Sequence, residues 1–151
     1  MSGYKRILLA VDLAEESSIV GARAIQLARL FGADLHVVHV VEPLSLVYGG
    51  DIPMDMSSIQ DQIQEQAQSS LDEFCDEAGV SEDHRYLIFG RPETEIHRIA
   101  VAADIDAIVV GSHGRHGLAL LLGSTANGVL HGASCDVLAV RVGPGAHRSA
   151  D

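Results

Sequence analysis

The chain has 151 residues, of which 47% are hydrophobic and 21% are charged, and its formal net charge is −11. A domain of this length buries about 68–70% of the surface of its unfolded chain, so one core can form without a disulfide or metal. The acidic charge repels phosphate backbones and anionic lipid, which argues against nucleic acid and membrane as partners.

The first half of the chain alternates short aliphatic runs with helical patterns. Branched aliphatic runs of five to seven residues are typical of buried strands, whereas an apolar stripe at 3.6-residue spacing predicts a helix. Acids in a first turn and a glycine after the last turn mark the helix ends. The expected elements are a strand at Ile7–Val11, a helix from Glu15 to Gly32, a strand at Leu35–Val41, a loop at 44–56 and a polar helix at 57–78.

The second half continues the alternation. It predicts a strand at 85–89, a helix from Glu93 with Ile96, Ile99 and Ala100 inward, a strand at 107–110, a helix at 124–131 and a last strand at 137–142. Strands that alternate with helices favour an α/β fold with right-handed crossovers. We therefore expect a doubly wound, five-stranded, mostly parallel, Rossmann-like sheet with helices on both faces. One domain would span residues 1–143, followed by a polar tail at 144–151.

Cysteine content and hydrophobic runs bear on the compartment. Cys75 and Cys135 are far apart and form no CxxC pair, which favours two reduced thiols in a reducing compartment. The first apolar run, Ile7–Val11, is too short for a signal peptide, and no stretch approaches membrane-spanning length. The sequence predicts a cytoplasmic protein.

Unusual residues follow two of the expected strands. Asp12 follows the first, and the fourth runs into a glycine-rich arm, Gly111–Gly123, that leads to Ser124. Ligands of open α/β sheets bind beyond the carboxyl ends of the strands. Glycines let backbone N–H groups approach an anion, and a helix start attracts phosphate. The pattern favours a nucleotide site, although glycines can also serve turns and Ser124 can also serve as a helix cap.

Several segments together resemble the universal stress protein family. They are Tyr4–Asp12, Leu35–Val41, Gly90-Arg91-Pro92, the glycines of Gly111-Ser112-His113-Gly114 through Gly123-Ser124, and Cys135–Arg141. The likeness covers nearly the whole chain, and the glycine pattern resembles the nucleotide-binding branch of the family. That branch spaces its glycines as Gly, two residues, Gly, nine residues, Gly and then Ser or Thr. Here eight residues, Arg115 to Leu122, separate Gly114 from Gly123.

The resemblance implies an ATP or AMP site, with Mg²⁺ as a companion held mostly by the nucleotide and water. Asp12 and the backbone of Val40 would face adenine and ribose, and Gly111 would lie by the ribose. The remaining residues that the likeness implies are Ala10 and Ser112 beside the nucleotide, Gly114, Gly123, Ser124 and Thr125 at the phosphates, and Asn127 just beyond.

Basic side chains and histidines were also weighed as ligands. For His113 and for Arg115 in the arm, phosphate contact and a plain loop role stay equally open. His36 and His39 are three residues apart on one strand, so they face opposite sides and cannot share a metal. No HExxH or CxxC motif signals a zinc site.

Three functions are compatible with the sequence. The first is a nucleotide-binding stress or signalling protein with an unknown protein partner. The second is a nucleotide-independent interaction protein, and the third is an enzyme, either a slow ATPase or a relative of adenylyl-transferring α/β proteins. The enzyme is disfavoured because Lys5 is the only lysine and no base is placed for an attacking water.

The last strand, Val137–Val142, is expected at an edge of the sheet. An exposed apolar edge is an association hazard unless it is paired. The family resemblance implies a homodimer through this strand, and Val140→Lys is expected to weaken it.

Overall fold

The computed structural model describes residues 3–11, 17–42, 56–112 and 124–141. The strands are β1 (Arg6–Ala10), β2 (Asp34–Val41), β3 (Arg85–Phe89), β4 (Ala107–Gly111) and β5 (Asp136–Val140). The helices are α1 (Ser17–Phe31), α3 (Met56–Ala78), α4 (Pro92–Ala102) and α5 (Ser124–Gly132), with a short 3₁₀ turn, η1 (Glu82–His84), before β3. Each strand and helix that falls in these ranges was predicted to within two residues, whereas η1 was not predicted.

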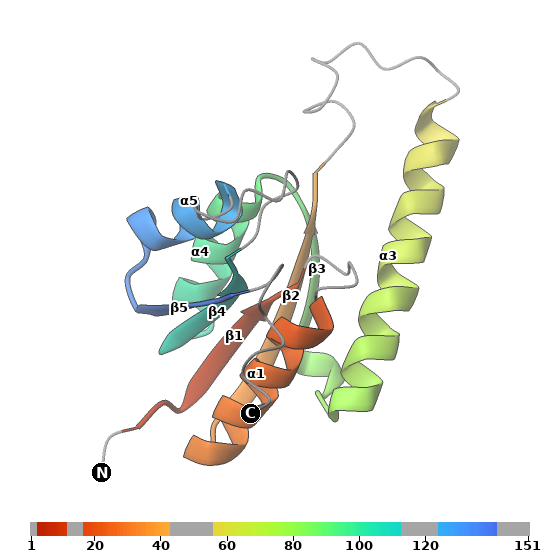
Figure 1. The fold of residues 1–151 in the computed structure, drawn as a ribbon. Coiled ribbons are helices and arrows are strands. Elements are labelled where there is room, and N and C mark those ends of the chain that lie inside the picture. Colours follow the sequence, from red (N-terminus) through yellow and green to blue (C-terminus); the bar gives the residue numbers. More distant parts are fainter. Residues whose placement is uncertain (1–2, 12–16, 43–55, 113–123, 142–151) are drawn as a thin grey trace.

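The strands form one parallel sheet in the order β3-β2-β1-β4-β5. The chain moves outward from β1 to β3, crosses back to β4 on the other side of β1, and ends at β5. Helices α1 and α3 lie on one face, and α4 and α5 on the other (Figure 1). This confirms the doubly wound α/β fold.

Alternation along each strand divides the core into two layers. Ile7 and Leu9 pack towards α1 and α3, whereas Leu8 and Val38 pack towards α4 and α5. The central strands carry branched aliphatic side chains because both of their faces are buried. In α4 the buried residues are Ile96, Ile99 and Ala100, as predicted.

Two glycines end helices on the same face of the sheet. Gly32 follows α1 with φ +64°, and Gly79 follows α3 with φ +75°. A positive φ is cheap only for glycine, so it is the favoured residue just past a helix end. The helix ends predicted from these two glycines are confirmed.

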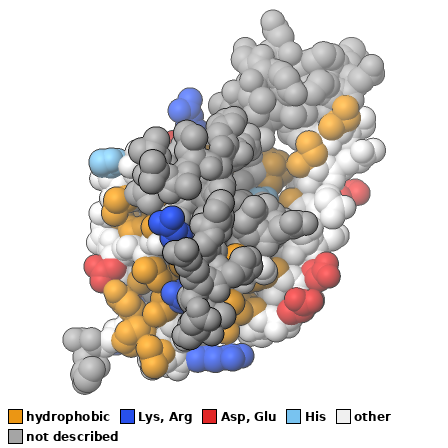
Figure 2. All heavy atoms as spheres, viewed as in Figure 1, with side chains coloured by type: hydrophobic (Ala, Val, Ile, Leu, Met, Phe, Trp, Pro, Cys, Tyr) orange, Lys and Arg blue, Asp and Glu red, His pale blue; other side chains and the backbone are white. Residues whose placement is uncertain are grey.

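The long helix α3 buries apolar side chains only over its carboxyl-terminal half. Ala67 and Leu71 are buried, but Ile59 and Ile63 are 44% and 39% exposed. The helix has 23 residues and is roughly 34 Å long, whereas the five-residue strand β3 spans roughly 17 Å. Its amino-terminal half therefore reaches past the sheet, and apolar and acidic side chains are exposed along it (Figures 1 and 2).

Asp106 joins strands at the amino edge of the sheet. Its Oδ2 accepts the backbone N–H groups of Lys5, at 2.7 Å, and Arg6, at 2.9 Å. These two hydrogen bonds hold the pKa of the Asp106 carboxyl below its usual value. Residues about one hundred positions apart in the chain are thereby joined where β1 begins.

Strand β5 lies at an edge of the sheet, as predicted, but the prediction that Val140 takes part in pairing at this edge is wrong. Val140 is only 5% exposed because it packs into the core on the α1 side, whereas Leu138 is 39% exposed. Val140→Lys would bury a charge and disrupt folding. Leu138 is the large apolar side chain of β5 that is exposed, beside exposed Ala139.

Candidate functional site

Strands β1 and β4 are the neighbours between which an open α/β sheet is expected to bind a ligand. Their register ends at Leu9 opposite Val109, and β4 stays paired with β5 through Ser112, whose N–H bonds to the Val140 carbonyl at 2.8 Å. The two central strands therefore separate at their carboxyl ends. The strand order also reverses here, which is the position where such sheets bind ligands.

Strands β1 and β2 separate at the same edge. The Val11 N–H bonds to the Val38 carbonyl at 3.0 Å, which is the last rung between them among the described residues. A continuing parallel ladder would next join the Val40 N–H to the Val11 carbonyl. That rung is absent from the described backbone pairs, and the His39 ring Nδ1 instead contacts the Val11 carbonyl at 2.7 Å.

The polar backbone groups of Val40 therefore face the place where β1 and β2 separate. Val38 and Val40 direct their N–H and C=O groups to the same side, towards β1, because alternate residues of a strand do so. The Val40 side chain packs in the core on the α4–α5 face. A half-buried N–H donor without a backbone partner in the described chain, beside a C=O acceptor, can accommodate a planar polar edge.

Helix α5 begins at this edge as well. It follows β4 and precedes β5, whose first residue lies opposite the start of β4, so α5 runs antiparallel to the strands. Its free N–H groups and positive dipole end therefore lie on the carboxyl side of the sheet. The His97 ring Nε2 donates to the Val129 carbonyl at 2.8 Å and ties α5 to α4.

The close approach of α5 and α4 depends on a glycine. A Cβ at Gly128 would lie 2.9 Å from the Glu93 Cβ, closer than real Cβ contacts allow. Ala126 and Val129 fill the space between α5 and the sheet. The start of α5 is thus placed by a packed helix pair.

Four predicted site residues come together at this edge: Ala10, Val40, Gly111 and Ser112, all half-buried. Asn127 is exposed on the first turn of α5. Ser124 and Thr125 open α5, but their side chains lie outside the described residues, as do Asp12, His113, Gly114, Arg115 and Gly123. The contact of His39 with Val11 was not predicted, because nothing in the sequence marks these two residues as neighbours.

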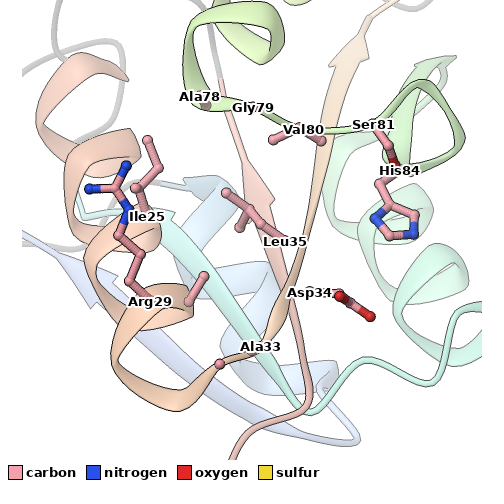
Figure 3. A pocket seen from close by; sticks show the side chains of 12 residues that line it. Ile25, Arg29, Ala33, Asp34, Leu35, Ala78, Gly79, Val80, Ser81 and His84 are labelled. Carbon is pink, nitrogen blue, oxygen red and sulfur yellow. The ribbon is translucent and has the colours of Figure 1, made fainter.

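A hollow of about 490 Å³ lies at the opposite, amino edge of the sheet, between the ends of α1 and α3 (Figure 3). Leu35, Ile25 and Val80 give it an apolar lining. Its charged groups do not converge, since Arg29 lies on one wall and Asp34 and His84 on the other (Figure 3). The carboxyl edge, with its backbone groups and helix start, has the more coherent chemistry.

The other strand histidine belongs to the core at the amino end. The His36 Nδ1 lies 3.0 Å from the Tyr86 hydroxyl, and its ring stacks on His84 with centroids 3.9 Å apart. Burial, and then the nearby His84, lower the pKa of His36. His36 and His39 face opposite sides of the sheet, as predicted.

The described ranges contain neither a metal-binding cluster nor a membrane-spanning helix. No group of three or more His, Cys, Asp or Glu side chains there could hold a metal ion. No helix in those ranges is long and apolar enough to span a bilayer.

Comparison with known proteins gives a consistent picture. The sequence profile described as the Universal stress protein family matches residues 3–141. "Universal stress protein A homolog 1" of Coxiella burnetii is 42% identical over 139 residues, which cover 91% of this chain and 96% of that protein.

Solved structures resemble the fold over almost the whole chain. The universal stress protein UspA from Lactobacillus plantarum superposes with a TM-score of 0.75 at 20% identity, covering 92% of this chain and 99% of that one. A universal stress protein in complex with cAMP superposes with a TM-score of 0.69 at 23% identity, covering 93% of this chain and 98% of that one. At these identities the structural likeness establishes the fold.

Proposed function

The chain belongs to the universal stress protein family, and from that premise we propose that it binds an adenine nucleotide, ATP or AMP, at the carboxyl edge of its sheet. It would act as a homodimeric stress-response or signalling protein of the cytoplasm, with its domain ending at residue 143. The observation that carries the proposal is the backbone of Val40, whose N–H lacks a backbone partner in the described chain where β1 and β2 separate.

The adenine base suits that backbone. Its Watson–Crick edge presents an acceptor nitrogen beside an amino donor, which complements one N–H and one C=O of the same residue. Guanine presents the reverse order, with a donor nitrogen beside a carbonyl. Val40 would therefore select adenine over guanine, while Ala10 and Asp12 flank the base and ribose.

The phosphates would lie between the end of β4 and the start of α5. Gly111 and Ser112 lead from the sheet, and the start of α5 supplies free N–H groups. The likeness to the nucleotide-binding branch adds Gly114, Gly123, Ser124 and Thr125 to this cradle, with His113, Arg115 and Asn127 beside it. Mg²⁺ would be held mostly by phosphate and water.

The proposal includes other ligands that carry an adenosine moiety. A related structure is titled as a complex with cAMP, so an adenosine moiety is the shared element that this edge would recognise. Slow ATP hydrolysis is a weaker proposal, because no lysine is available for the phosphates. The alternative is a nucleotide-independent dimer that acts through an unidentified protein partner.

Released nucleotide tests the proposal. Freshly purified protein is denatured, and the supernatant is identified by chromatography and mass spectrometry, with added ATP then titrated by calorimetry. We expect ATP or AMP near one per chain, and its loss in Gly114→Asp. Wild-type protein that is empty and also ignores added ATP would contradict the proposal and leave the interaction protein in its place.

The dimer has a separate test at β5. Leu138→Lys places a charge on the exposed side of the edge strand, and we expect monomers by light scattering. Leu130→Lys, at an exposed position of α5, is the matched control and should remain dimeric. A Leu138→Lys protein that stays dimeric would contradict pairing through β5.

A further inference from the structure

We propose that His39 is a positioning residue that keeps the base-binding edge of β2 open, an inference that rests on the proposed nucleotide site. The ring occupies the acceptor that the ladder would otherwise offer to Val40. His39 would touch no nucleotide atom itself. It would act through the backbone of Val11 and Val40.

The geometry at His39 defines the hydrogen bond. Ala10 lies opposite Val38, so Val11 lies opposite His39, and the ring reaches across to the carbonyl of its own register partner. A carbonyl oxygen only accepts, so the Nδ1 atom at 2.7 Å carries the proton and donates. The ring is half-buried on the α1–α3 face of the sheet.

The consequence falls on the next rung of the ladder. In a regular parallel pair the Val11 carbonyl would accept the Val40 N–H. With the imidazole there instead, this N–H lacks a backbone partner in the described chain and stays available to a ligand.

His36 shows that a histidine on this strand does not open the ladder by itself. It lies opposite Leu8 within the paired part of β1, and its ring contacts the side-chain hydroxyl of Tyr86. The backbone pairing around it is intact. What distinguishes His39 is its place at the last residue before β1 and β2 part.

Three variants separate the role from general stability. His39→Leu removes the donor and keeps an apolar side chain, His39→Asn keeps an amide donor near the Nδ1 position, and His36→Leu is the control on the same strand. All three are checked for folding by circular dichroism before use. ATP and GTP affinities are measured by calorimetry, and the Val40 amide is followed by hydrogen exchange without nucleotide.

We expect His39→Leu to bind ATP about tenfold more weakly, since one hydrogen bond to the base is lost to the closed ladder. Its preference for ATP over GTP should fall by a similar factor, which a stability defect alone would not cause. Its Val40 amide should exchange more slowly, because it now bonds to Val11. His39→Asn should restore most of the affinity, and His36→Leu should leave both affinities within twofold.

Two results would overturn the inference. One is a His39→Leu protein with unchanged ATP affinity and unchanged preference for ATP over GTP. The other is a Val40 amide that exchanges at the same rate in wild type and His39→Leu. Failure of the wild type to bind ATP would instead reject the proposed function, while the exchange comparison would still decide whether His39 opens the edge.

Discussion

The two edges of the sheet use side chains in opposite ways. At the amino edge, Asp106 accepts the N–H groups of Lys5 and Arg6 and completes their hydrogen bonding. At the carboxyl edge, His39 takes the Val11 carbonyl, and the N–H of Val40 is left without a backbone partner in the described chain. At the amino edge a side-chain carboxylate supplies an acceptor for two backbone N–H groups. At the carboxyl edge a side-chain imidazole replaces a backbone N–H as the donor to the Val11 carbonyl.

The amino edge is closed by further contacts. The Tyr4 hydroxyl donates to Asp136 Oδ2 at 2.7 Å. The Tyr4 ring packs edge-on against the Phe31 ring, with the ring centroids 5.0 Å apart. These contacts join the start of β1 to the start of β5 and the end of α1. The same five strands are thus joined by side chains at one end, while β1 separates from its neighbours at the other.

Of the substitutions at the amino edge, Asp106→Ala should lower the free energy of unfolding most. Two charge-assisted hydrogen bonds disappear at a solvent-accessible edge, so we expect unfolding to become about 1–2 kcal/mol easier. Urea unfolding measures this, with Asp106→Asn as the matched variant of equal size. ATP affinity should stay within twofold, and a large loss of affinity would show that the two edges are not independent.

The stability contributed by the hydrogen bonds to Asp106 should also depend on pH. The pKa of Asp106 is lowered in the folded state by the Lys5 and Arg6 N–H groups, so its contribution is present above the unfolded pKa of about 3.9. It is lost as the pH falls through the lower folded value. The stability gap between wild type and Asp106→Asn should be full near pH 7 and shrink below about pH 4.

A gap of constant size across that pH range would contradict the carboxylate account. It would assign the contribution to the shape of the side chain.

The smallest expected effect is that of Tyr4→Phe. The ring contact with Phe31 is kept and one exposed hydrogen bond to Asp136 is lost, so unfolding should become easier by about 0.5 kcal/mol. Thermal unfolding below pH 9 measures it. A loss of unfolding free energy as large as that of Asp106→Ala would contradict this ranking. It would mean that the contact with β5 stabilises the amino edge as much as the Asp106 hydrogen bonds do.

Much of the fold could be predicted because its signals are local. The run Ala107–Val110 is buried on both faces, and Gly32 and Gly79 end their helices with positive φ. The exposed stretch of α3 could not be predicted, because its apolar stripe does not reveal how far the sheet beneath it extends. The turn η1 has three residues and carries no periodic pattern.

The candidate site could be predicted in part for a related reason. Residues such as Gly111 and Ser112 follow a recognisable strand, so the edge they occupy follows from the topology. The contacts of His39 and Asp106 depend on register between distant strands, which single-residue patterns do not carry. Val40 was expected at the base from the family likeness. That its N–H lacks a backbone partner in the described chain follows only from the hydrogen-bond register of β1 and β2.

Hydrogen exchange of wild-type protein with and without saturating ATP tests the central claim most directly. The account predicts that ATP slows exchange of the Val40 amide, while the amides of Lys5 and Arg6, already bonded to Asp106, do not change. ATP that binds without protecting Val40, or that protects both edges equally, would contradict an adenine site at the open carboxyl edge.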